Sequence, residues 1–196
     1  QGKLGHRSNL WFLGRKSQIN EIISDNEIEK NRLTVIQSIL GVRLLISPYF
    51  FLKIRRASGE NNIIHQHGLF LPISLLTLSV NKKSKIIISP HGYLEPEKLR
   101  VSSFKKKTVL RLFENKNLKN CDCLVACSKK EALSLRDFGL SQPVVILPNG
   151  VSESLIRKKP PNNKDLAFKL KYDISPNTRI LLFLSRIHPF KGLELF

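Results

Sequence analysis

Three short segments of the chain combine histidine, glycine and basic side chains at places where a predicted strand ends. They are 65–68 (HQHG), 89–93 (SPHGY) and 185–192 (SRIHPFKG). In parallel α/β sheets, ligands bind beyond the carboxyl ends of the strands. These segments are therefore the candidate binding and catalytic elements of the chain.

Two cations, Arg186 and Lys191, stand in the third segment just before Gly192 and a predicted helix. Free N–H groups at a helix start and two fixed positive charges form a site that suits a diphosphate. Such a site can stabilise a leaving phosphate without a metal ion, because the fixed charges supply the electrostatic stabilisation. A solvated basic loop has the same spacing, so both interpretations stay open.

The histidines His67 and His91 are each followed by glycine, which lets the backbone approach a ligand closely. An imidazole there can donate to a sugar hydroxyl or a phosphate, or move a proton, and we favour a functional role for both. For His65, inside a predicted strand, we favour contacts that satisfy it within the protein. A zinc site from these three residues lacks thiolate or carboxylate partners at a suitable spacing, so no metal is expected.

The composition is that of a globular protein with a large basic excess. The 196 residues include 33 Lys and Arg against 15 Asp and Glu, a formal net charge of +18, and 41% are hydrophobic. Disordered and collagen-like chains are excluded, and no apolar run approaches the ~20 residues of a membrane span. The charge predicts an anionic partner, either a nucleic acid, an acidic membrane surface or a phosphorylated small molecule. Cys121, Cys123 and Cys127 are interpreted as small, buried, reduced side chains.

Short apolar runs alternate with helical patterns, which predicts a parallel α/β fold. Strands are expected at 10–13, 62–66, 85–89, 123–126, 144–147 and 179–185, and helices at 48–56, 72–80, 103–116 and 128–139. The last helix begins with a capping box formed by Ser128 and Glu131. We expect one domain over 1–150, a linker over 151–176 and the start of a second domain over 177–196. The chain has no Met and begins at Gln1, so we expect an internal fragment with further structure at both ends.

The predicted helix 103–116 belongs to the most basic stretch of the chain. Residues 97–120 include eight basic and two acidic residues. Val109, Leu112 and Phe113 are expected on its apolar face. With the basic residues that follow 49–51 (YFF), this stretch could hold the protein on anionic lipid. Charge runs are usually solvated faces, but the excess over the whole chain favours a surface attraction.

Taken in order, these pieces resemble glycosyltransferase family 4. The residues that carry the resemblance are His67-Gly68, 89–92 (SPHG) with Leu94 and Pro96, Cys127-Ser128 with Glu131, 148–151 (PNGV), and Arg186 with Lys191-Gly192. It extends from about residue 5 to the end of the chain. It implies the GT-B fold, in which two Rossmann-like domains, each a parallel sheet with helices on both faces, face one another across a cleft. The acceptor would bind mainly to the first domain and a nucleotide-sugar donor mainly to the second.

The resemblance also implies roles for single residues. Arg186, Lys191 and Gly192 would hold the donor diphosphate, and His91 would lie next to the transferred sugar as the catalytic residue. The expected cleft-lining residues are His67, Gly68, Gly92, Tyr93, Asn149 and Gly150. Members of this family generally need no metal or cofactor and retain the anomeric configuration.

The resulting hypothesis is sugar transfer to a glycan or lipid-linked acceptor in cell-envelope polysaccharide biosynthesis. The expected location is cytoplasmic, with peripheral attachment to the inner face of the cytoplasmic membrane as an option. The family's first strand, its glycine-rich loop and a downstream pair of glutamates are not among the 196 residues, so we expect little or no transferase activity from this chain alone.

Three alternatives remain open. One is a sugar-nucleotide epimerase of the same fold, and another is a non-catalytic partner subunit or gene remnant. The third is a basic nucleic-acid-binding module. It is disfavoured because 97–120 offers only Phe104 and Phe113 for base stacking, and no nucleic-acid partner is expected.

Overall fold

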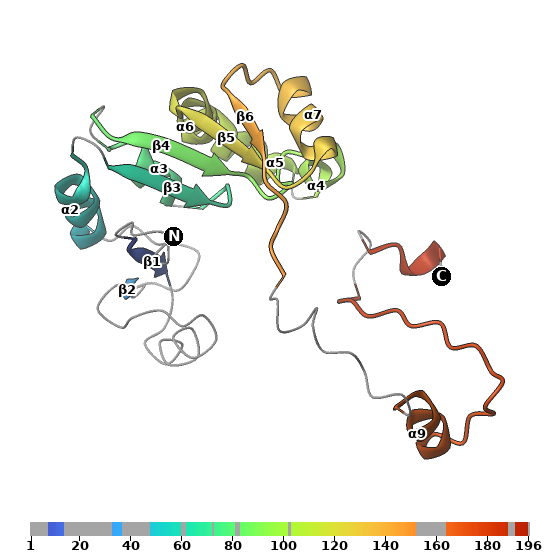
Figure 1. Ribbon diagram of the computed structural model, residues 1–196. Helices are drawn as coiled ribbons and strands as arrows, with labels where there is room; N and C mark the ends of the chain where they lie inside the picture. Colours follow the sequence, from blue (N-terminus) through green and yellow to red (C-terminus); the bar gives the residue numbers. More distant parts are fainter. Residues whose placement is uncertain are drawn as a thin grey trace. The chain divides into compact units, whose positions relative to one another are not determined.

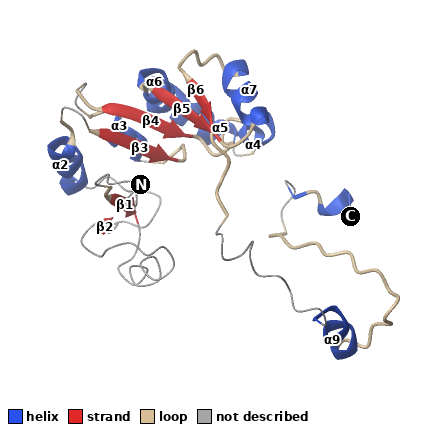
Figure 2. Ribbon diagram, in the orientation of Figure 1, coloured by secondary structure: helices blue, strands red, loops and turns tan. Residues whose placement is uncertain are grey.

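The computed structural model describes residues 8–13, 33–36, 48–59, 62–71, 73–80, 83–101, 103–151, 164–187 and 191–195. The chain divides into two compact units, 1–148 and 149–196. Figures 1 and 2 show that the first unit contains the main sheet with its helices. None of the helices in the described ranges is long and apolar enough to cross a bilayer.

A parallel sheet of four strands forms the centre of the first unit (Figure 1). Its strands lie in the order of the sequence: β3 (Ile63–His67), β4 (Lys85–Ser89), β5 (Cys123–Ala126) and β6 (Val144–Ile146). Their isoleucine- and valine-rich runs are typical of parallel strands. The register pairs His67 with Ser89, so the carboxyl ends of β3 and β4 finish level with one another. All four predicted strands are confirmed to within a residue.

A second, two-stranded parallel sheet pairs β1 (Leu10–Leu13) with β2 (Leu33–Ile36). The prediction of β1 is confirmed. Sequence reasoning missed β2, although its Leu-Thr-Val-Ile run contains three β-branched residues in a row.

The helices between the four main strands pack on one face of the sheet. They are α3 (Ile73–Thr77) after β3, then α4 (Pro96–Arg100), α5 (Ser103–Val109), the π-helical turn η3 (Leu110–Glu114) and α6 (Asn115–Asn120) after β4, and α7 (Lys129–Asp137) after β5. Right-handed crossovers between strands in sequential order place every connecting helix on the same side. The strand residues Ile88, Leu124 and Ala126 alternate toward this face and are fully buried against Leu118 and Leu135. The predicted parallel α/β sheet flanked by helices is confirmed, with the connecting helices on one face.

A smaller core lies beside β3. Ile54 of α2 (Pro48–Ala57) packs with Leu76 of α3 and with Val80, and Trp11 and Ile64 contact this cluster. The predicted helix over 48–56 is therefore confirmed, and its apolar side packs against α3 and β3.

The predicted basic helix continues beyond residue 116, because α5, η3 and α6 follow one another without a break. In η3 the N–H of Asn115 donates to the carbonyl of Leu110, five residues back. This extra residue rotates the helix, so that Glu114 and Leu118 face the core. The expectation that Leu112 lies on the apolar face is wrong, since its side chain is 72% exposed.

The second unit contains the helix α9 (Lys164–Lys171) and a 3₁₀ turn, Leu193–Leu195. The strand expected over 179–185 does not form, and Leu181 and Leu184 are 81% and 88% exposed. A strand needs a neighbour for its backbone hydrogen bonds, and the described residues of this unit contain no second strand. The prediction of a strand over 179–185 is therefore wrong, although the segment has the apolar composition of one.

Candidate active site

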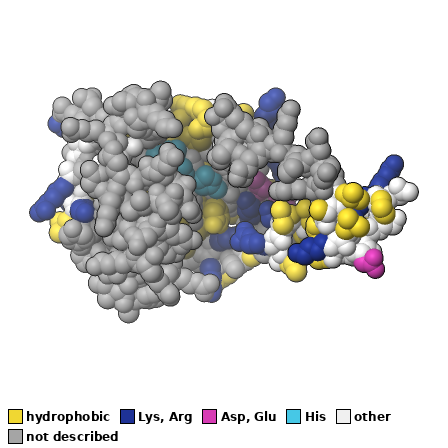
Figure 3. All heavy atoms as spheres, turned by 60° about the horizontal axis from the view of Figure 1, so that its bottom comes forward, with side chains coloured by type: hydrophobic (Ala, Val, Ile, Leu, Met, Phe, Trp, Pro, Cys, Tyr) yellow, Lys and Arg dark blue, Asp and Glu magenta, His cyan; other side chains and the backbone are white. Residues whose placement is uncertain are grey.

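Three side chains from separate strand ends meet at the carboxyl edge of the main sheet. Nδ1 of His67, the last residue of β3, lies 3.0 Å from Nε2 of His91, which follows β4. Nδ1 of His91 lies 3.5 Å from Sγ of Cys127, which follows β5. The His67 and His91 rings are stacked, with centroids 5.2 Å apart, and the described histidines reach the surface in Figure 3. The strand-end segments at 67 and 91 thus form one site, as the parallel topology requires.

The backbone at His91 is held in an uncommon conformation. His91 and Gly92 both have positive φ, 54° and 71°, and the N–H of Tyr93 donates to the carbonyl of Pro90 at 3.2 Å. Two successive left-handed residues closed by this hydrogen bond form a tight turn that favours glycine at the second position. The turn directs the His91 ring back across the strand ends toward His67 and Cys127.

A buried carboxylate fastens this turn to the neighbouring helix. Oε1 of Glu131 accepts from the N–H of Gly92 at 2.5 Å, and its Oε2 accepts from the N–H of Cys127 at 2.7 Å. The serine half of the predicted capping box is confirmed, because Ser128 Oγ accepts from the N–H of Glu131 at 3.1 Å. The glutamate itself reaches past the cap and joins two of the three site segments.

A buried polar network supports the other segment, His67 to Phe70. Gln66 donates to the carbonyl of Gly68 at 2.9 Å, and Asn117 donates to Gln66 at 3.1 Å. Glu114 accepts from the N–H of Phe70 at 2.9 Å and from Asn117 at 3.2 Å. Burial raises the pKa of Glu114 above its usual value. The π-helical turn brings this carboxyl group under the loop.

Burial favours the neutral forms of the His67 imidazole and the Cys127 thiol. Burial lowers the pKa of His67 and of His65, and neighbouring histidines lower both further. Burial, followed by the Glu131 charge, raises the pKa of the Cys127 thiol. Two proton arrangements satisfy both contacts: the thiol donates to His91 Nδ1 and His91 Nε2–H donates to His67 Nδ1, or His67 Nδ1–H donates to His91 Nε2 and His91 Nδ1–H donates to the sulfur. Nε2 of His67 is a donor toward a ligand in the first arrangement and an acceptor in the second.

A family model described as Glycosyltransferase Family 4 matches residues 2–155, most of the chain. The chain belongs to glycosyltransferase family 4. It is a glycosyltransferase domain, and a reaction of this class requires a sugar donor and an acceptor. A comparison with curated proteins found no match.

The structure of this glycosyltransferase domain brings together five of the predicted site residues. His67, Gly68, His91, Gly92 and Tyr93 all lie at the carboxyl edge of the sheet, and the Tyr93 ring makes an edge contact with Phe70 at 6.2 Å. His65 is satisfied within the protein as expected, because its Nε2 lies 2.7 Å from Ser89 Oγ.

Sequence reasoning missed the role of Cys127 and half of the role of Glu131. Cys127 is half-buried and contacts His91, whereas Cys121 is fully buried, and burial raises its pKa to about 12. None of the three cysteines is joined in a disulfide. The signal for Glu131 was present as a capping box, but a sequence does not reveal a contact with Gly92, 39 residues away.

The remaining predicted site residues belong to the second unit. Arg186, Lys191, Asn149 and Gly150 are exposed, and Gly192 has a φ of 67° in a turn closed by the N–H of Leu195. His188 lies outside the described residues. The prediction that the basic pair faces His91 across a cleft stays a prediction. In the described part of the chain, no group of three His, Cys, Asp or Glu side chains is placed to hold a metal ion.

Proposed function

We propose that this glycosyltransferase moves a sugar from a nucleotide-sugar donor to a glycan or lipid-linked acceptor, with retention of the anomeric configuration. The observation that carries the proposal is the hydrogen-bonded array of His67, His91 and Cys127 at the sheet edge of a family 4 domain. The reaction would serve cell-envelope polysaccharide biosynthesis on the cytoplasmic side of the membrane.

The histidine array would recognise the transferred sugar. Neutral imidazoles donate and accept hydrogen bonds without attracting a shell of counterions, which suits the hydroxyl groups of a sugar. His67 is exposed and offers its Nε2 to a ligand, and the left-handed turn holds His91 beside it. In this proposal His91 is the residue nearest the reacting carbon, and Gly68 and Gly92 let the sugar approach the backbone closely.

The donor diphosphate would be bound by Arg186 and Lys191 with the N–H groups after Gly192. Two fixed cations can balance the charge that develops on the leaving nucleotide, so we propose a reaction without a metal ion or other cofactor. Asn149 and Gly150 would lie along the same cleft. The support for this part is the residue types and their spacing in the sequence.

A binding experiment tests the donor site. The purified chain is titrated calorimetrically with a panel of nucleotide sugars, with and without EDTA. The double variant Arg186→Gln/Lys191→Gln should bind its nucleotide sugar at least about tenfold more weakly, since each charge-assisted contact contributes on the order of 1.5–3 kcal/mol. The matched control Lys169→Gln/Lys171→Gln removes the same charge from α9 and should bind normally. Equal binding by both double variants, or loss of binding in EDTA, would contradict the proposal.

A second experiment tests the histidine array. The variant His91→Ala is made in a form of the protein that shows transfer activity. It should lower the transfer rate by at least about a hundredfold and leave nucleotide affinity within a few fold. NMR of the product should show the anomeric configuration of the donor. Conversion of a nucleotide sugar into its epimer without any acceptor would instead identify the alternative enzyme class.

A further inference from the structure

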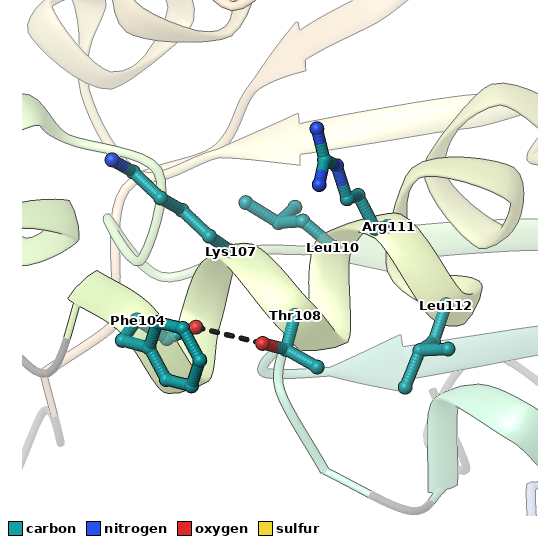
Figure 4. A pocket seen from close by; sticks show the side chains of 6 residues that line it. All are labelled: Phe104, Lys107, Thr108, Leu110, Arg111 and Leu112. Atoms are coloured by element: carbon teal, nitrogen blue, oxygen red, sulfur yellow. Dashed lines mark hydrogen bonds between the residues drawn. The ribbon is translucent and has the colours of Figure 1, made fainter.

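The helix formed by α5 and η3 carries an apolar row and a cationic row on its outer side. Phe104 is 82% and Leu112 is 72% exposed, although both are large and apolar. In Figure 4 they lie with Thr108 along one edge of this outer side, whereas Lys107 and Arg111 extend from its opposite edge. A hollow of about 560 Å³ runs along this surface, lined in the described part of the chain by Phe104, Lys107, Thr108, Leu110, Arg111 and Leu112.

The charge on this helix is almost entirely of one sign. Residues 103–120 contain six basic side chains and a single acid, Glu114. Glu114 is fully buried and accepts from the N–H of Phe70, so it does not neutralise the outer side. Lys106 turns inward to the carbonyl of Lys98 and the Phe70 ring, while Lys105, Lys107 and Arg111 stay exposed. The outer side is therefore cationic with apolar side chains beside the charges.

The inner side of the same helix fixes this orientation. Leu110 packs against the main core, and Glu114, Asn117 and Leu118 are buried under the loop after β3 and against α3. Turning Phe104 and Leu112 inward would require breaking that packing. The rows thus face outward as a consequence of the fold.

We propose that the outer side of α5 and η3, defined by Phe104, Lys105, Lys107, Arg111 and Leu112, binds the surface of an anionic membrane. Apolar side chains beside a basic stripe are what an interfacial helix needs: the apolar row enters the boundary between headgroups and acyl chains, and the cations contact lipid phosphates. A nucleic acid would share the charge complementarity but would leave Leu112 without a partner, since stacking needs rings. This inference does not depend on the glycosyl transfer reaction, and its test uses no sugar.

Flotation with lipid vesicles tests the surface. The chain should float with vesicles of phosphatidylcholine mixed with phosphatidylglycerol and not with phosphatidylcholine alone. Lys107→Gln/Arg111→Gln should weaken binding about 30-fold, because each cation near an anionic surface contributes about 1 kcal/mol. Phe104→Ser/Leu112→Ser keeps the charge and should still weaken binding about tenfold or more, which separates insertion from simple attraction.

Matched controls come from the rest of the same molecule. Leu133 of α7 is also exposed, at 65%, and Leu133→Ser should leave binding unchanged. Lys129→Gln/Lys171→Gln removes two exposed cations from α7 and α9 and should cost clearly less than the loss at residues 107 and 111. All the substituted side chains are exposed, and circular dichroism of each variant verifies that it folds.

An insertion measurement completes the test. Tryptophan placed by Phe104→Trp should be quenched by brominated lipid in anionic vesicles, whereas tryptophan placed by Leu133→Trp should behave like the unmodified protein with its Trp11 alone. The proposal is overturned if anionic vesicles fail to bind the chain, or if Phe104→Ser/Leu112→Ser binds them normally. It is equally overturned if duplex RNA binds the chain and Phe104→Ser/Leu112→Ser and Lys107→Gln/Arg111→Gln lose RNA binding in parallel with vesicle binding, since that pattern identifies a nucleic-acid surface.

Discussion

Replacing Glu131 by Gln should lower the stability of the domain and disturb the orientation of the His91 ring at the same time. The carboxylate is 3% exposed and accepts two backbone N–H groups, from Gly92 at 2.5 Å and from Cys127 at 2.7 Å. An amide has only one oxygen, so one buried N–H loses its acceptor and faces an NH₂ group instead. One lost hydrogen bond to a charged group, with its donor left buried, costs about 2–4 kcal/mol.

That cost is large against the 5–15 kcal/mol or so that stabilises a typical domain. Urea denaturation followed by circular dichroism measures it directly. Glu131→Ala should cost at least as much, because it leaves the N–H groups of both Gly92 and Cys127 without their acceptor. Asp137→Asn is the control, since it changes an exposed carboxylate at the other end of the same helix and should leave the midpoint nearly unchanged.

A second measurement connects the stability effect to the site. In Glu131→Gln the imidazole NMR signals of His91 and His67 should shift, because the turn that aligns their rings has lost its anchor, whereas those of His65 should move little. If Glu131→Gln unfolds at the same urea concentration as the wild type and leaves the histidine signals in place, the carboxylate does not hold the turn and the reasoning is refuted.

Three further predictions concern pH, a second carboxylate and a helix end. Because burial lowers the folded-state pKa of His65 and His67, the unfolded chain takes up protons below about 6.5 that the folded chain does not. Stability is therefore fully present above that pH and should fall as the pH drops through the folded-state values, and His67→Asn should flatten this loss in urea midpoints measured from about pH 7 to about pH 5. Glu114→Gln should cost less than Glu131→Gln at neutral pH, because the amide loses the hydrogen bond from Asn117 but can still accept from the Phe70 N–H and avoids burying a charge; a cost as large as that of Glu131→Gln would contradict this. Gly139→Ala should cost about 1 kcal/mol in the same denaturation assay, since the residue has a φ of +88° and an added Cβ would meet no atom within 4 Å, so a larger loss would mean that contacts rather than backbone strain decide.

Local sequence rules predicted the parts of the fold that depend on neighbouring residues. The isoleucine runs at β3 and β4, the cap at Ser128 and the strand ends at His67 and His91 all depend on short-range patterns, and each lies where it was expected. The parallel topology then brings the two histidines together without further information.

Other features escaped because they depend on partners distant in the chain. The outward direction of Leu112 follows from one extra residue in the helix, and the periodicity of an ideal α-helix cannot show that shift. The segment 179–185 has a composition typical of a buried strand, but a strand also needs a neighbour, which composition does not supply. The hydrogen bond from Gly92 to Glu131 joins residues 39 positions apart, so only the folded structure reveals it.

The five-residue turn at 110–114 also determines where this gene can lose a codon. The turn already accommodates one extra residue, so deleting one residue there and returning to ordinary helical spacing would keep the stretches on either side in nearly their present orientation. A deletion within 105–109, where the spacing is already α-helical, would instead rotate Phe104 by about 100° relative to Leu118 in the core, although every remaining amino acid was unchanged. Single-codon deletions should accordingly be better tolerated in this turn than in the helix before it.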